Sequence, residues 1–205
     1  MKSKAKSGSK VLWGLLYAGT FAAAFVLSAI FKMTYDPLRT RVEWNDEVGT
    51  VYTDLSYGQG SANKFDLYVP TDNTKGTYGL VVYLHAGGFT AGDKSGDAEI
   101  LKWLCARGYV AAGVNYTLFG EENPQASIYT QSLEIRNSIP AIQAEAEQLG
   151  YPLDRMAIAG GSAGGCLALI YAYRDAPSSP IPVKMVFEAV GPASFHHEDW
   201  TCYGL

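Results

Sequence analysis

Apolar residues form runs of two kinds along this chain. Residues 11–31 make up 21 positions without a charged side chain. The later apolar runs are short and are separated by polar or glycine-rich turns. Residues 80–84 and 109–114 are continuous apolar runs, as expected of strands that are buried on both faces. The pattern predicts one long apolar helix followed by a domain of strands and helices.

The remaining elements of the domain follow from local periodicity. Residues 50–57 and 64–69 alternate between apolar and polar positions, which predicts an antiparallel hairpin at the edge of a sheet. Residues 127–149 place apolar side chains near a period of 3.6, which predicts a helix that Pro140 should kink or split. Further elements are predicted as helices at 97–107 and 163–173, the second of them buried, and as strands at 156–159 and 183–190.

Strands and helices alternate from residue 80 onward. This alternation predicts an α/β fold, with a mostly parallel sheet covered by helices on both faces. In such sheets the functional site lies at the carboxyl ends of the strands. The segments that directly follow the predicted strands are therefore the places to look for chemistry.

The long apolar segment fits a membrane. At about 1.5 Å per residue, a helix over 11–31 spans roughly 30 Å, the thickness of a hydrocarbon core. Four lysines precede it, and no acidic residue occurs before Asp36. This bias predicts a single-pass anchor with a cytoplasmic N-terminus and an extracytoplasmic domain. The alternative is a cleaved signal peptide, with the small residues 22–24 as its cleavage region. The product would then be secreted.

Charge divides the chain in the same place. The whole chain has a net charge of −4, whereas residues 32–205 carry 12 basic and 20 acidic side chains. We therefore expect a basic cytoplasmic tail at 1–10, a transmembrane signal anchor at 11–31, a linker at 32–48 and an α/β domain at 49–205. The acidic domain argues against nucleic-acid binding.

Composition excludes several other classes. Apolar residues make up 48% and charged residues 18% of the chain, which excludes a disordered or collagen-like protein. The three cysteines are too few and too scattered for a disulfide scaffold, and no Cys-x-x-Cys pair or histidine-rich cluster indicates a zinc site. We expect no cofactor and no metal. Oligomeric state stays open.

A Gly-x-Ser-x-Gly motif lies between the strand predicted at 156–159 and the helix that follows it. In this context Ser162 is expected on a strained turn, with its hydroxyl exposed and the backbone N–H of Ala163 pointing at the same space from a helix N-terminus. The glycines let strand and helix approach closely. The alternative is an ordinary glycine-rich turn in which Ser162 caps the helix.

A second glycine-rich segment, His85-Ala86-Gly87-Gly88-Phe89, follows the run at 80–84. Adjacent glycines at a strand end can present backbone N–H groups to a developing oxyanion. The alternative is a flexible turn. His85 is expected to fix this loop through hydrogen bonds rather than to act as a base.

The two motifs together resemble the α/β-hydrolase fold in its carboxylesterase branch related to hormone-sensitive lipase. The resemblance covers roughly residues 50–195. It implies that Ser162 is the nucleophile and that Gly87, Gly88 and Ala163 supply the oxyanion N–H groups. It also implies that Asp93 and Lys94 hold the loop, whereas Ala86 departs from the family, which usually has glycine there.

The implied activity is hydrolysis of small carboxylic esters through an acyl-enzyme. Hydrolysis of peptides by a serine peptidase of the same fold is an alternative, although the pairing of the HAGGF and GGSAGG stretches favours an esterase. The expected partners are a small-molecule ester and, through residues 11–31, a membrane.

The acid and base of the catalytic triad are harder to place. The family's order is Ser, then Asp or Glu, then His, and only His196 and His197 follow Ser162. We expect the domain to be incomplete at its C-terminus, with acid and base beyond residue 205 and a hydrophobic edge on the strand at 183–190. The alternatives are that His196 or His197 is the base, with Glu198 or Asp199 beside it, or that the chain is a non-catalytic binding module.

Overall fold

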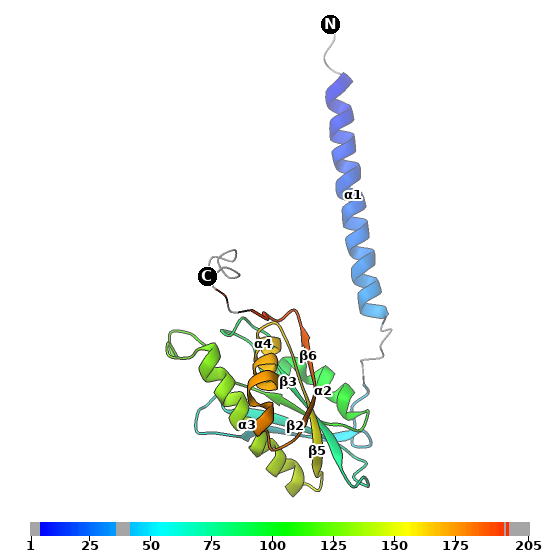
Figure 1. Ribbon diagram of the computed structural model, residues 1–205. Coiled ribbons are helices and arrows are strands. Elements are labelled where there is room, and N and C mark those ends of the chain that lie inside the picture. Colours follow the sequence, from blue (N-terminus) through cyan, green and yellow to red (C-terminus); the bar gives the residue numbers. More distant parts are fainter. Residues whose placement is uncertain (1–4, 36–41, 195, 197–205) are drawn as a thin grey trace. The chain divides into compact units, whose positions relative to one another are not determined.

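The computed structural model describes residues 5–35, 42–194 and 196, with side chains from Lys10 onward (Figure 1). The chain divides into two compact units, one within residues 1–41 and the other within 42–205. The second unit begins inside the segment predicted as a linker. Trp44 already packs edge-on against Tyr68 there, with 5.8 Å between ring centroids.

The first unit is a single helix, α1 (Ala5–Thr34). Its stretch Lys10–Thr34 has 25 residues and a mean hydropathy of 1.9, so it is long and apolar enough to cross a membrane. Large apolar side chains along it, such as Phe21 and Phe25, are exposed. A signal sequence has the same properties, so the two interpretations of this segment both remain open.

The second unit is built on a six-stranded sheet in the order β1-β2-β4-β3-β5-β6. The hairpin β1–β2 and the pair β2–β4 are antiparallel, and β4, β3, β5 and β6 run parallel. The mostly parallel sheet and the edge hairpin predicted from the sequence are therefore confirmed. The strands are β1 (Gly49–Ser56), β2 (Lys64–Pro70), β3 (Tyr78–Leu84), β4 (Val110–Val114), β5 (Leu153–Gly161) and β6 (Val183–Ala189).

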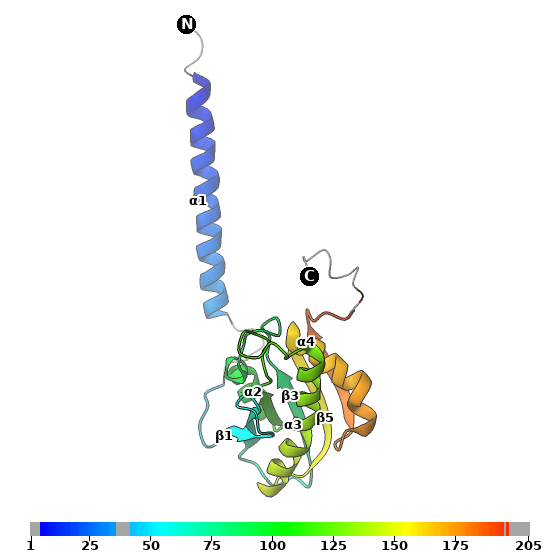
Figure 2. The same cartoon turned by 90° about the vertical axis from the view of Figure 1, so that its left-hand side faces the viewer.

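Helices cover both faces of this sheet. Figure 2 shows α2 on one side and α3 and α4 on the other. The helical segments are η1 (Lys94–Asp97), α2 (Ala98–Cys105), α3 (Ile128–Gln148), α4 (Ala163–Ile170), the π-helical turn η2 (Tyr171–Asp175) and η3 (Ala176–Ser178).

Successive side chains along the strands belong alternately to two separate hydrophobic cores. In β2, Leu67 belongs to the larger core under α3 and α4, whereas the next residue, Tyr68, belongs to the smaller core under α2. In β4, Ala112 and Ala111 divide in the same way. Successive side chains of a strand point to opposite faces, so apolar side chains on both faces of these strands are buried.

Two helices differ in detail from their predictions. α3 remains one helix through Pro140, so the predicted split is wrong. Pro140 is exposed, so the carbonyl that loses its N–H partner faces water. α4 ends at Ile170 rather than at 173, where the backbone turns into η2, and Tyr173 is exposed rather than buried.

The connection order places a switch point in the middle of the sheet. From β3 the chain passes to β4 on one side and then crosses to β5 on the other. At the carboxyl ends of β3 and β5, Leu84 pairs with Gly160. The segments that follow these two strands therefore start side by side, at the point where ligands bind in open α/β sheets.

At the other end of the strand order, β6 pairs with β5 alone among the described residues. Met185 and Phe187 are each 59% exposed on it. They line an apolar groove of about 540 Å³ together with Trp103 of α2. In the part of the chain that the structure describes, β6 therefore presents apolar side chains at the end of the sheet.

Candidate active site

The serine turn, residues 160–164, joins β5 to α4. Ser162 has φ 50° and ψ −117°, which is a left-handed conformation rarely adopted by a non-glycine residue. Its side chain makes no capping hydrogen bond to α4, so the capping role considered from the sequence is wrong. Backbone strain of this kind is found mostly at functional turns, where the surrounding structure holds it.

Close packing explains the two glycines that flank the serine. A methyl group at Gly164 would lie 2.0 Å from the carbonyl oxygen of Leu84, and one at Gly160 would lie 2.4 Å from the carbonyl carbon of Gly164. Real side chains do not tolerate such distances. The glycines thus let α4 start directly against the end of β3.

Backbone bonds fix the orientation of the turn. The N–H of Ser162 donates to the carbonyl of Ala189 in β6 at 2.8 Å, and the carbonyl of Ser162 accepts from Cys166 at 3.0 Å. Ala163 is the first residue of α4 and is buried. Its N–H belongs to the first turn of a helix, where N–H groups lack intrahelical partners and attract negative charge.

The glycine loop, residues 85–92, follows β3. Gly87, Gly88 and Phe89 all have left-handed φ values, of 139°, 60° and 67°. The carbonyl of Gly87 accepts from the N–H groups of Thr90 and Ala91, which closes a tight turn. A methyl group at Gly87 would lie 1.9 Å from the Ala91 carbonyl oxygen, whereas one at Gly88 would meet nothing within 4 Å. Gly88 therefore faces open space.

The structure brings the glycine loop and the serine turn together. A methyl group at Gly161 would lie 3.9 Å from Cβ of Ala86, which is ordinary contact. A methyl group at Gly164 would lie 2.7 Å from the His85 carbonyl oxygen. The two motifs recognised in the sequence are therefore neighbours at the switch point of the sheet.

His85 is 3% exposed and lies beneath the loop. Its ring stacks on Tyr116, with centroids 4.3 Å apart, and its Nδ1 lies 2.9 Å from the carbonyl oxygen of Ala86. The Tyr116 hydroxyl donates to the His85 carbonyl at 2.8 Å. Burial lowers the pKa of His85, so its ring is neutral near pH 7. We keep loop support as its proposed role.

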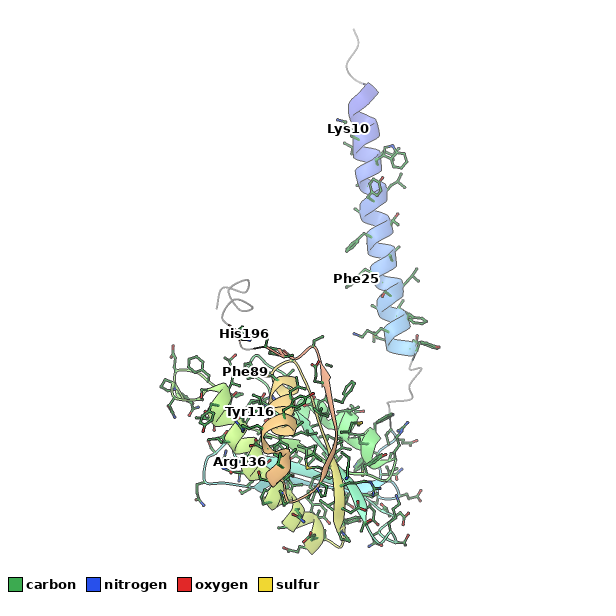
Figure 3. All side chains as sticks on the ribbon, in the orientation of Figure 1. Lys10, Phe25, Phe89, Tyr116, Arg136 and His196 are labelled. Atoms are coloured by element: carbon green, nitrogen blue, oxygen red, sulfur yellow. The ribbon has the colours of Figure 1, made fainter. Side chains whose placement is uncertain are left out.

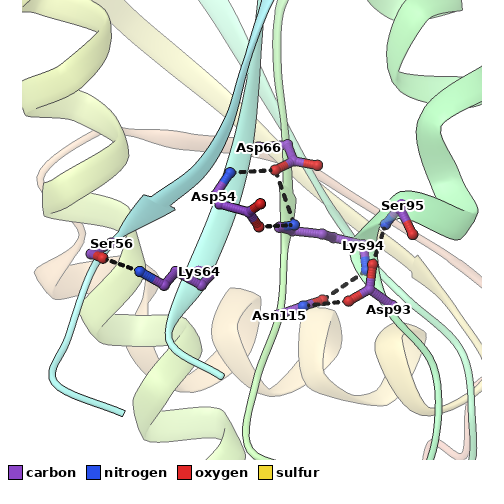
Figure 4. A network of polar contacts seen from close by, with 8 residues as sticks. All are labelled: Asp54, Ser56, Lys64, Asp66, Asp93, Lys94, Ser95 and Asn115. Carbon is purple, nitrogen blue, oxygen red and sulfur yellow. Dashed lines mark hydrogen bonds and ion pairs between the residues drawn. The ribbon is translucent and has the colours of Figure 1, made fainter. Parts of the chain in front are cut away.

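Lys94 connects the loop to the edge hairpin. Its side chain is 6% exposed, and Nζ lies 2.8 Å from Asp54 and 3.0 Å from Asp66 (Figure 4). Burial opposes its charge, but the hydrogen bonds that Lys94 donates to both carboxylates outweigh burial and raise the pKa of Lys94. Asn115 adds a third connection, because it accepts from the Lys94 N–H at 2.7 Å and donates to Asp93 at 2.6 Å.

The carboxyl groups of Asp93 and Asp97, one on either side of Lys94 along the chain, have opposite pKa shifts. Partial burial opposes ionisation of Asp93, but hydrogen bonds from Ser95 and Asn115 outweigh it and lower the pKa of Asp93 to about 2. Burial and the nearby charge of Asp93 raise the pKa of Asp97 to about 6. Oδ2 of Asp97 is buried and has no hydrogen-bond partner among the described residues.

The Asp97 shift predicts a pH-dependent effect of Asp97→Asn. An unfolded Asp has a pKa near 3.9, so the folded state binds this proton more tightly, and the associated stability is lost as pH rises from about 4 to about 6. Asp97→Asn should therefore raise the free energy of unfolding at pH 7.5 by on the order of 1–3 kcal/mol. Urea unfolding should show no such gain at pH 4, and an equal gain at both values would contradict the shift.

Sequence reasoning missed the contribution of α3 to the loops. Gln131 is fully buried, and its Nε2 donates to the carbonyls of Phe89 at 2.9 Å and Thr117 at 2.8 Å. Glu134 accepts from the N–H and the hydroxyl of Thr117. The sequence contained one indication that Gln131 is buried. It lies four residues before Ile135 and therefore on the apolar stripe of the helix.

The structure describes one of the two histidines considered as the base. His196 follows β6 and is exposed, and its N–H donates to Oγ of Ser194 at 3.3 Å. Figure 3 shows its side chain toward the same end of the sheet as those of Phe89 and Tyr116. In the described part of the chain, no hydrogen bond joins His196 to Ser162. His197 lies outside the described residues.

Comparison with known proteins identifies the family. Residues 65–197, which make up more than half of the chain, match the BD-FAE family. The chain belongs to the BD-FAE family. The match contains the glycine loop and the serine turn. The α/β-hydrolase resemblance drawn from these two motifs is thus confirmed.

Curated relatives of this BD-FAE chain are described as esterases. It is 29% identical over 122 residues to the "Probable carboxylic ester hydrolase LipM" of Mycobacterium tuberculosis. It is 30% identical over 112 residues to the "Probable isoprenylcysteine alpha-carbonyl methylesterase ICMEL1" of Oryza sativa subsp. japonica. These matches cover 58% and 55% of this chain but 27% and 25% of the relatives, so the chain spans about a quarter of their length.

Solved structures share the fold. Esterase B from Lactobacillus rhamnosis superposes with a TM-score of 0.63 at 23% identity, covering 88% of this chain and 58% of that structure. A bacterial heroin esterase gives a TM-score of 0.60 at 23% identity, covering 74% of this chain and 47% of that structure. The BD-FAE chain thus has the architecture of esterase-like α/β-hydrolases.

Proposed function

We propose that this chain carries the nucleophile and the oxyanion hole of a serine carboxylesterase that hydrolyses small carboxylic esters. Ser162 is the nucleophile, and the N–H groups of Gly87, Gly88 and Ala163 form the oxyanion hole. His85 and Asp93 support the loop that presents the two glycines. The family and the esterase relatives support this reaction class.

The conformation of Ser162 is the observation that carries the proposal. The residue is held at φ 50° at the end of β5, and its side chain makes no capping bond that would explain the strain. Gly88, where an added methyl group would meet nothing within 4 Å, belongs to the loop that packs against this turn. A strained serine beside a glycine loop that can present backbone N–H groups is the arrangement that acyl transfer needs.

The chemistry proceeds in two steps. The Ser162 oxygen attacks the ester carbonyl carbon while a base takes its proton, and the alcohol then leaves with a proton to give an acyl-enzyme. Water, deprotonated in the same way, attacks the acyl-enzyme and releases the carboxylic acid. The candidates for the base that this chain offers are His196 and His197.

The apolar helix α1 indicates where the proposed esterase domain lies in the cell. In the membrane form, α1 anchors the esterase domain, with the N-terminus in the cytoplasm and the domain outside it. The four lysines that precede residue 11 favour this orientation. A secreted domain after cleavage is the alternative, and the mass of the protein recovered from membranes decides between them.

Covalent labelling tests the nucleophile. We expect the full chain in detergent micelles to react with an alkyl fluorophosphonate at one site, with mass spectrometry placing the adduct on Ser162. Heat-denatured protein should stay unlabelled, because labelling requires the assembled oxyanion hole. A native chain that is labelled on another serine would contradict the proposal, and one that stays unlabelled would exclude His196 and His197 as the base.

A further inference from the structure

The strained glycine loop depends on contacts from outside itself. Three consecutive residues, Gly87, Gly88 and Phe89, have left-handed φ values, and the third is not a glycine. A left-handed non-glycine residue costs roughly 1–2 kcal/mol. Such a conformation persists only where the surrounding structure holds it.

The side chain of Gln131 provides such a contact to the glycine loop. It extends from the first turns of α3 and is fully buried. One amide N–H bond of Nε2 points to the carbonyl of Phe89 and the other to that of Thr117, at 2.9 and 2.8 Å. Phe89 follows β3 and Thr117 follows β4, so a single amide connects the loops after two neighbouring strands. The Phe89 carbonyl accepts a second bond, from the Phe119 N–H at 3.0 Å.

The chemistry of the amide matches this task. A primary amide nitrogen offers two donors without a charge, whereas a hydroxyl offers one and an ionised carboxylate offers none. Lysine or arginine could donate twice, but only by burying a charge. Oε1 of Gln131, in contrast, is buried and unpaired among the described residues, at a cost of about 1–3 kcal/mol. The two donors of one neutral nitrogen match the two carbonyls that it joins, those of Phe89 and Thr117.

We propose that Gln131 is a positioning residue, which holds the Phe89 carbonyl and thereby sets the direction of the Gly87 and Gly88 N–H groups toward Ser162. This inference rests on the proposed esterase function. Gln131 itself contacts no reacting atom. It acts through the backbone of the glycine loop, while Glu134 fixes the other side of Thr117 at its N–H and hydroxyl.

The test compares Gln131→Met with Gln143→Met in the full chain in detergent micelles. Methionine keeps the length of the side chain and removes both donors. Gln143 lies on the same helix, but its amide bonds only to Glu147 near the surface. Fluorophosphonate labelling is measured over a range of probe concentrations. We expect Gln131→Met to lower the limiting rate by about 10- to 100-fold with little change in the half-saturating concentration, because misplacement affects the transition state more than binding.

Hydrogen exchange gives a readout that does not depend on activity. In Gln131→Met, amides in residues 86–92 and 115–120 should exchange faster, while those in β3 and β5 stay as in the unaltered chain. Gln131→Asn, which shortens the side chain by one methylene, should have the same effects and remains available if the methionine variant does not fold. Gln143→Met should match the unaltered chain in both measurements.

The outcomes separate the two proposals. If the unaltered chain is labelled, and Gln131→Met is labelled at the same limiting rate with unchanged exchange, the positioning role is wrong and the esterase proposal stands. If the unaltered chain is labelled on a serine other than Ser162, the esterase proposal is wrong. Exchange at 86–92 and 115–120 then still decides whether Gln131 holds the two loops.

Discussion

Ser162→Ala is expected to abolish covalent labelling by fluorophosphonates and to lower hydrolysis of p-nitrophenyl butyrate by about 10³-fold or more. The side chain of Ser162 makes no capping bond, so its hydroxyl is available for attack. Removal of the nucleophile leaves only the oxyanion N–H groups, which stabilise charge but form no acyl-enzyme.

The same substitution should not weaken the fold. The hydroxyl caps nothing, and alanine has the same Cβ in the left-handed conformation, so the free energy of unfolding should stay within about 0.5 kcal/mol. Ser56→Ala is a matched control, because Ser56 lies on the edge strand β1 and accepts only from Lys64 in the hairpin. Equal labelling of Ser162→Ala and the unaltered chain would remove Ser162 from the mechanism.

Local pattern was sufficient for most of the fold. Buried strands appear as continuous apolar runs because residues on both faces must pack, and residues 80–84 end at the same residue as β3. The Gly-x-Ser-x-Gly motif was informative because a side chain at either of its glycines would clash with backbone atoms. Any sequence that forms this turn must therefore have glycine at both positions. Such requirements act between residues that are close along the chain, so sequence reasoning finds them.

The supporting contacts of the site were not found because they join distant residues. The resemblance implied that Lys94 holds the loop, but not that it pairs with Asp54 and Asp66, which lie in the hairpin and are separated from it along the chain by β3. Gln131 reaches Phe89 across 42 positions. Either side chain alone looks like a polar residue on a loop or a helix. Only the strand order, which places the loops after β3 and β4 side by side, shows what these side chains hold.

The two motifs also depend on each other. The serine turn requires glycine at 164 because α4 starts against the carbonyls of Leu84 and His85, which lead into the glycine loop. The nucleophile and the oxyanion donors are therefore positioned by one close contact between β3 and α4. A change in that contact should affect stability and reactivity together.

Gly164→Ala is expected to be strongly destabilising. The added methyl group would lie 2.0 Å from the Leu84 carbonyl oxygen, 2.5 Å from its carbonyl carbon and 2.7 Å from the His85 carbonyl oxygen. All three atoms are backbone, so they cannot move away as a flexible side chain can. Overpacking of a core costs typically 1–3 kcal/mol and more where backbone must shift. We expect a loss of about 3 kcal/mol or more in urea unfolding followed by tryptophan fluorescence.

Gly161→Ala provides the matched control three residues away. Its methyl group would meet Cβ of Ala86 at 3.9 Å and the Tyr83 hydroxyl at 4.0 Å, which are ordinary contacts. Its backbone does not have a left-handed φ, so alanine is not strained there. Gly161→Ala should unfold within about 1 kcal/mol of the unaltered chain and keep fluorophosphonate labelling. If both alanine variants are equally stable, the contact between α4 and the end of β3 is not what places the nucleophile beside the oxyanion donors.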